Sequence, residues 1–157
     1  MLKGFSFCDG LAGVAWALSA FSKINNIELN DILLDFDPLI EKFTIKKIMN
    51  LDYDFLYGGF GGVLYFIDRK DIVSITKITK ILDHKLSTFN NASLFFDIEN
   101  SNLYDKEIIN LNLAHGMASF LAICNIAINE NIKPIWFKSK LLKLANMYFD
   151  LIIENKE

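Results

Sequence analysis

Apolar positions along the chain recur at spacings of three and four, and this pattern predicts helices almost throughout. A short, strongly apolar run predicts a helix over residues 10–22 that is buried on most sides. The pair Asp37-Pro38 matches a helix start, with an N-cap acid before a proline at the first helical position, and predicts a helix that runs to Met49. A third helix is predicted over residues 61–68.

The second half of the chain continues the helical pattern around one polar interruption. One face of a further helix is marked by Ile72, Ile75, Ile78 and Leu82. The β-branched residues between these positions leave a strand as the alternative. The polar, Asn-rich stretch over residues 87–104 predicts a long connection. The clearest amphipathic stripe comprises Met117, Phe120, Leu121, Cys124, Ala127 and Ile128. Lys133-Pro134 begins the last predicted helix, whose core face comprises Leu141, Leu144, Ala145, Tyr148 and Ile152.

A glycine-rich tetrad opens three of these apolar runs. The copies are Gly10-Leu11-Ala12-Gly13, Gly58-Gly59-Phe60-Gly61 and Gly116-Met117-Ala118-Ser119. Their spacing of about fifty residues suits one helical hairpin per repeat. Apolar, tetrad-led helices alternate with more charged helices, which is typical of the inner and outer helices of an α/α toroid. We therefore expect an all-α toroid of about three repeats, an incomplete ring, forming a single domain over residues 1–157. The tetrads should gather at one end of the ring and build the site there.

Composition narrows the classes of protein and partner. The 157 residues are 52% hydrophobic and carry a net charge of −3 without a basic stripe, so nucleic acid is a poor candidate partner. No apolar run approaches the roughly 18 residues of a membrane-spanning helix. A signal peptide at the N-terminus is disfavoured because Asp9 and two glycines interrupt its apolar region. Cys8 and Cys124 lack a pairing motif, which favours free thiols and a cytoplasmic location.

The third tetrad follows a histidine, and the second follows an aspartate. His115 can shuttle a proton through its two ring nitrogens, or it can simply bond backbone groups at a helix start. Asp54 can orient that histidine or transfer a proton, or it can favour a helix start through the helix dipole. Asp52 is the neighbouring candidate for the acid, and the sequence does not separate the two beyond the register of the motif. The glycines indicate close packing rather than phosphate binding, because the P-loop lysine and strand are missing.

Three stretches resemble the lanthionine synthetase C-like family: residues 10–14, 52–58 and 110–116, the last with a Leu-Ala-His-Gly core. The resemblance covers essentially the whole chain. It implies an α/α toroid with zinc in its cavity, and the addition of a peptide cysteine thiol to a dehydrated Ser or Thr, which closes a thioether ring in lantibiotic-type peptides. Asp54 and His115 match the positions of the family's proton-transfer residues, so these two are the predicted catalytic residues.

The chain departs from the family pattern at the metal. The family holds zinc with two cysteines and a histidine, one cysteine directly preceding the histidine, and this chain has no such pair. Cys8, Cys124 and His84 do not match the ligand positions. Because a catalytic zinc site needs three protein ligands, we predict no zinc, no other cofactor and no metal site in this chain.

These observations lead to one preferred interpretation and two alternatives. The chain is interpreted as an N-terminal, partial cyclase domain that is inactive alone, with a precursor peptide, a missing C-terminal half or a second copy of itself as partners. The first alternative is a non-catalytic toroid module that binds a peptide or a partner. The second is a glycoside-processing α/α enzyme with Asp54 as general acid and Asp52 or Asp97 as the second carboxylate.

Overall fold

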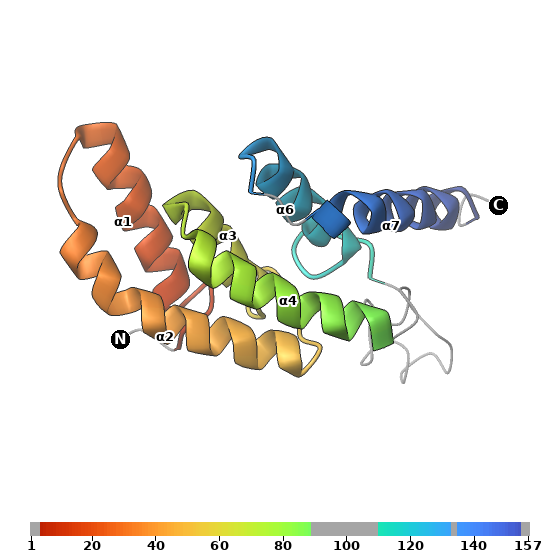
Figure 1. Ribbon diagram of the computed structural model, residues 1–157, viewed down its shortest axis with the longest axis horizontal. Helices are drawn as coiled ribbons and strands as arrows, with labels where there is room; N and C mark the ends of the chain where they lie inside the picture. Colours follow the sequence, from red (N-terminus) through yellow and green to blue (C-terminus); the bar gives the residue numbers. More distant parts are fainter. Residues whose placement is uncertain (1–3, 89–109, 133–134, 155–157) are drawn as a thin grey trace.

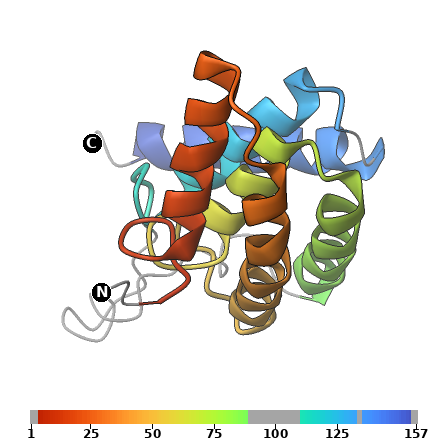
Figure 2. The same cartoon turned by 90° about the vertical axis from the view of Figure 1, so that its left-hand side faces the viewer.

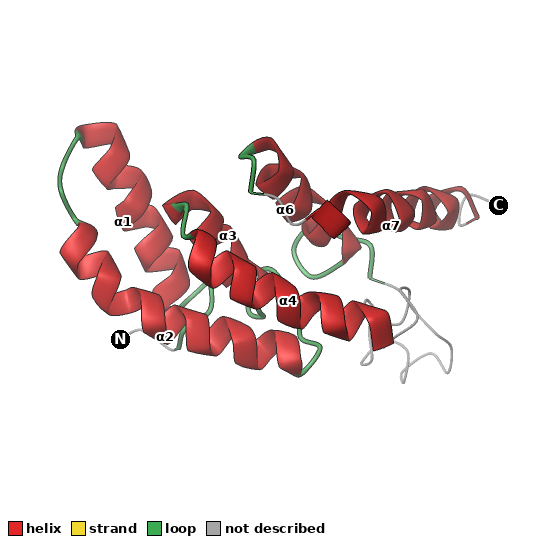
Figure 3. Cartoon of the chain, viewed as in Figure 1, coloured by secondary structure: helices red, strands yellow, loops and turns green. Residues whose placement is uncertain are grey.

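A computed structural model describes residues 4–88, 110–132 and 135–154. These ranges are helical wherever they are regular, with no strand among them (Figure 3). The helices are α1 (Leu11–Asn25), α2 (Asn30–Met49), α3 (Phe60–Arg69), α4 (Ile72–Thr88), α6 (Met117–Asn129) and α7 (Ile135–Glu154) (Figure 1). The predicted all-α class is confirmed, and the strand alternative for residues 72–82 is wrong.

Consecutive helices pack as three hairpins, α1 with α2, α3 with α4, and α6 with α7. The tetrad-led helices form an inner layer in which α1 and α6 each pack against α3, and the outer helices α2 and α4 lie side by side (Figures 1 and 2). This is the packing of inner and outer hairpins in an α/α toroid, as expected.

The hydrophobic core is centred on α3, which is buried along most of its length. The predicted stripe on α6 is buried at Met117, Phe120, Cys124 and Ala127. Most of the predicted face of α4 is also buried, at Ile75, Ile78 and Leu82, whereas Ile72 is exposed. On α7, Tyr148 packs against the core at partial burial. Helical periodicity therefore identified the inward faces correctly.

The second helix begins earlier than the sequence predicts. It starts at Asn30, and Pro38 lies inside it, so the predicted start at Asp37-Pro38 is wrong. Proline cannot donate the usual hydrogen bond to the preceding turn, and Figure 1 shows the first turns of α2 at an angle to the rest. The Asp37 carboxylate does not cap the helix. It accepts a hydrogen bond from the Tyr65 hydroxyl at 2.5 Å and pairs with Arg69 at 3.3 Å.

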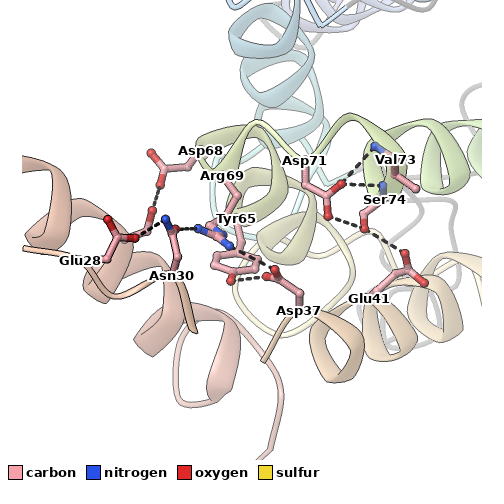
Figure 4. A network of polar contacts seen from close by, with 11 residues as sticks. Glu28, Asn30, Asp37, Glu41, Tyr65, Asp68, Arg69, Asp71, Val73 and Ser74 are labelled. Atoms are coloured by element: carbon pink, nitrogen blue, oxygen red, sulfur yellow. Dashed lines mark hydrogen bonds and ion pairs between the residues drawn. The ribbon is translucent and has the colours of Figure 1, made fainter. Parts of the chain in front are cut away.

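Further polar contacts hold α2 against its neighbours (Figure 4). Arg69 at the end of α3 donates to the Asn30 side chain at 2.9 Å. The Ser74 hydroxyl on α4 lies 2.9 Å from a Glu41 carboxylate oxygen and 2.7 Å from an Asp71 carboxylate oxygen. These contacts join α2 to the end of α3 and to the start of α4.

Some predictions fall outside the described residues. The connection over residues 87–104 lies there apart from its first two residues, which belong to α4. The predicted start at residues 133–134 and the side chains of Leu141 and Leu144 also lie outside. None of the helices described combines the length and apolarity needed to cross a membrane.

Candidate functional site

Three loops of the same construction precede the inner helices. We call residues 4–10 the first loop, 52–58 the second loop and 110–116 the third loop. Each loop ends at the first glycine of a tetrad, and the next residue donates its N–H to the carbonyl of the residue that begins the loop. These hydrogen bonds run from Leu11 to Gly4 at 3.0 Å, from Gly59 to Asp52 at 3.0 Å, and from Met117 to Asn110 at 2.9 Å. The repeated tetrad is thus the end of a repeated loop.

Each loop ends in glycine because the backbone passes too close for a side chain. A Cβ atom at Gly116 would lie 2.2 Å from the Asn110 carbonyl oxygen, and one at Gly58 would lie 2.6 Å from the Asp54 nitrogen. None of the chain's glycines has a positive φ, so close approach rather than left-handed backbone requires glycine here. This agrees with the packing interpretation of the tetrads.

The third residue of each loop has a side chain that accepts from the backbone N–H three residues later. The pairs are Ser6 with Asp9 at 3.4 Å, Asp54 with Tyr57 at 2.6 Å, and Asn112 with His115 at 2.6 Å. Asp54 therefore has a structural role inside its own loop, and that role occupies only its Oδ1 atom.

The loops lie in a row, joined by backbone hydrogen bonds. The Phe7 and Cys8 N–H groups of the first loop donate to the Leu56 carbonyl of the second loop at 3.0 and 2.9 Å. The Phe55 N–H of the second loop donates to the Ala114 carbonyl of the third loop at 3.2 Å. The expectation that the tetrads gather at one end of the helices is confirmed.

This row brings His115 and Asp54 together. The Oδ2 atom of Asp54 contacts the Nδ1 atom of His115, and the two side chains are 21% and 40% exposed. A carboxylate oxygen only accepts hydrogen bonds, so Nδ1 carries the hydrogen and the Nε2 atom of the neutral ring keeps its lone pair. Nε2 has no hydrogen-bond partner among the residues described. The pair can therefore accept and return a proton at Nε2 of a side chain that is partly exposed.

Tyr57 lies against this pair. Its ring is parallel to the His115 ring, with 6.2 Å between centroids and 4° between planes, an offset stack. The Cys8 side chain, through a hydrogen bond and its charge, raises the pKa of Tyr57, and the Asp9 and Asp54 carboxylates add to this effect. Sequence reasoning did not single out Tyr57 as a neighbour of His115, or Cys8 as a neighbour of Tyr57, because both contacts depend on the order of the loops.

The structure separates the two candidate acids. Asp52 forms an ion pair with Lys47 at 2.6 Å, five residues earlier in the chain. Asp54 alone of the two contacts His115. Asp97, the other carboxylate considered for a glycoside-processing site, lies outside the described residues.

The cysteines and the remaining histidine are not grouped for metal binding. Cys8 is exposed in the first loop, whereas Cys124 is 2% exposed inside the core, where burial raises the pKa of its thiol. His84 is exposed on α4. Across the part of the chain that the structure describes, no three His, Cys, Asp or Glu residues are placed to share a metal ion. These residues do not fit the zinc ion that the family resemblance implies, and the absence of zinc stays a prediction.

A hollow of about 470 Å³ adjoins the first loop. Phe7, Cys8 and Asp9 line it from the loop, and Val14 and Trp16 line it from α1. Its mixture of aromatic, aliphatic and acidic groups can receive a side chain of a bound peptide.

Comparison with known proteins gives one match. The family model described as "Lanthionine synthetase C-like protein" matches residues 1–157 and so includes all three loops. No curated protein and no solved structure matches the chain.

Proposed function

Because the chain belongs to the lanthionine synthetase C-like family, we propose that it acts in thioether formation on a dehydrated precursor peptide, with His115 as the proton-transfer residue. The observation that carries this proposal is the contact between Asp54 Oδ2 and His115 Nδ1, which engages one ring nitrogen and leaves the other, Nε2, for proton transfer. Asp54 is the positioning residue, because its Oδ2 contacts Nδ1 and so orients the imidazole.

In the proposed reaction, His115 is the one group that donates a proton and regains it in each cycle. A thiolate adds to the β-carbon of a dehydroalanine, a carbon–sulfur bond forms, and the electron pair of the double bond moves toward the carbonyl as an enolate. The imidazolium of His115 then donates its Nε2 proton to the α-carbon. The neutral imidazole regains a proton from the next thiol, so the net change is addition of S–H across the double bond.

The loop geometry supports this assignment. The second loop lies between the first loop, which borders the hollow, and the third loop, which carries His115. A peptide that crosses the row of loops from the hollow therefore passes the Asp54–His115 pair. In family members that hold zinc, the metal would bind the cysteine thiol of the peptide and lower its pKa. The residues described here do not fit zinc, and the mechanism takes no step through it.

The test uses a substrate that needs no thiol activation. A short peptide containing one dehydroalanine is mixed near neutral pH with an aromatic thiol, which is acidic enough to be partly ionised there while an imidazole still carries a proton in part, and thioether formation is followed by mass spectrometry. A positioned proton donor contributes about 10²- to 10⁴-fold, so we expect acceleration by the wild-type chain and its loss in His115→Ala. Lys77→Ala, on the outer surface of α4, is the matched control and should match the wild type.

Two outcomes would oppose the proposal. Equal rates of thioether formation with and without the protein would contradict a proton-transfer role for His115. Equal rates for the wild type and His115→Ala would mean that another group causes any acceleration. Peptide binding that survives His115→Ala without any acceleration would favour the non-catalytic binding module instead.

A further inference from the structure

The row of loops has an unused donor at one edge and an unused acceptor at the other. The fourth residue of a loop donates its N–H to the carbonyl of the fifth residue of the next, as Phe55 does to Ala114. In the third loop the corresponding donor is the N–H of Leu113, a residue that is 64% exposed. In the first loop the corresponding acceptor is the Cys8 carbonyl. Neither group makes a hydrogen bond to any residue that the structure describes.

The side chains at these two edges are also complementary. Between the second and third loops, the side chain at the third position, Asp54, contacts the side chain at the sixth position, His115. In the third loop the third position is Asn112, whose Oδ1 is used within the loop and whose NH₂ group remains as a donor. In the first loop the sixth position is Asp9, whose Oδ1 accepts from Ser6 and whose Oδ2 remains as an acceptor.

The inner helices follow the same order as the loops, and apolar side chains are exposed near both ends of the row. α1 packs on α3, and α3 packs on α6. Near the loops, Val14 on α1 is 39% exposed and lines the hollow at the first loop, and Leu113 in the third loop is 64% exposed. Large apolar side chains exposed next to unused backbone groups are typical of a surface that binds protein.

We propose that a second copy of this chain docks head to tail, so that its first loop continues the row after the third loop. At the junction, the Leu113 N–H donates to the Cys8 carbonyl of the second copy, and the Asn112 amide donates to the Asp9 carboxylate of the second copy. The donor edge and the acceptor edge are different surfaces, so the contact is heterologous and closes into a ring or extends. The second copy thereby borders the His115 site. This inference does not depend on the proposed function.

The test is sedimentation velocity of the full chain over a range of concentrations. The wild type should show association that increases with concentration. Asn112→Asp keeps the acceptor needed inside the loop but places a carboxylate opposite Asp9, so we expect association to weaken about fivefold to tenfold. Adding Asp9→Asn restores a donor opposite that carboxylate and should restore association. Leu113→Pro removes the backbone donor and should weaken association, whereas Leu113→Ala retains the donor and serves as the control.

Three results would overturn the proposal. One is a wild-type chain that stays monomeric at every concentration. Another is association that Asn112→Asp leaves unchanged or that Asp9→Asn fails to restore. The third is a monomer whose Leu113 amide is protected from hydrogen exchange, because another segment of the same chain would then cover the edge. Circular dichroism of each variant identifies any loss of folding, and the Asn112 and Asp9 variants decide the question if Leu113→Pro does not fold.

Discussion

Replacing Gly62 by alanine should destabilise the protein, and replacing Thr44 by alanine as well should remove that loss. Gly62 lies in α3 where this helix packs against Thr44 of α2. A Cβ atom at Gly62 would lie 1.9 Å from the Thr44 hydroxyl oxygen and 3.1 Å from the Thr44 Cβ atom. Thr44 is fully buried, and its hydroxyl has no hydrogen-bond partner among the residues described.

The size of the effect follows from two opposing contributions. Alanine in place of glycine inside a helix stabilises by about 1 kcal/mol, and overpacking of a buried contact costs about 1–3 kcal/mol. An overlap at 1.9 Å belongs at the upper end of that cost, so Gly62→Ala should lower the free energy of unfolding by about 1–2 kcal/mol. Without the threonine hydroxyl and methyl, the nearest atom is the Cβ at 3.1 Å, and the helix preference of alanine prevails. The two substitutions should therefore couple by about 2 kcal/mol.

Urea unfolding of the wild type, both single variants and the double variant measures this coupling. Gly4→Ala is the control, since nothing lies within 4 Å of a Cβ atom at that glycine. If Gly62→Ala costs the same in both backgrounds, to within about 0.5 kcal/mol, the close approach of α2 and α3 is not what requires glycine.

Three further predictions concern the site and its surroundings. Asp54→Asn should slow thioether formation by about 10²-fold or more. It should change the free energy of unfolding by less than about 1 kcal/mol, because the Asp54–His115 pair is partly exposed and Asn112 shows that an asparagine at the third position braces a loop of the same construction. Kinetics and urea unfolding of one preparation test both. Burial raises the pKa of Tyr53 to about 12, so the folded state keeps a proton that the unfolded state releases near pH 10. Stability should therefore fall as the pH rises from about 10 to about 12, and urea midpoints across this range should fall less in Tyr53→Phe. A thiol reagent should label Cys8 alone in the folded protein and both Cys8 and Cys124 in urea, and labelling of both before unfolding would contradict the buried position of Cys124.

The helices and their inward faces were predictable because burial follows helical periodicity, whereas the start of α2 was not. Asp37-Pro38 has the composition of a helix start, but the Asp37 carboxylate is engaged by Tyr65 and Arg69, about thirty residues away in the chain. Contacts between residues so far apart in the chain leave no local pattern in a sequence. The sequence therefore did not show that Pro38 lies inside a helix.

The candidate site was predictable in part. The resemblance identified Asp54 and His115, and the structure brings them into contact. The choice between Asp52 and Asp54 depended on Lys47, which a sequence pattern does not place. One signal was available and missed: aligning the three first glycines puts Asp54 in the same column as Ser6 and Asn112, all residues whose side chains brace loops.

The stereochemistry of the addition product tests the central claim most directly. A proton delivered by His115, held by Asp54, reaches the α-carbon from one side, whereas a proton from solvent reaches it from both. With the dehydroalanine peptide and the aromatic thiol, chromatography should show one dominant diastereomer for the wild-type chain and the buffer mixture for His115→Ala. A wild-type product with the same diastereomer ratio as the reaction in buffer would contradict a proton-transfer role for this pair.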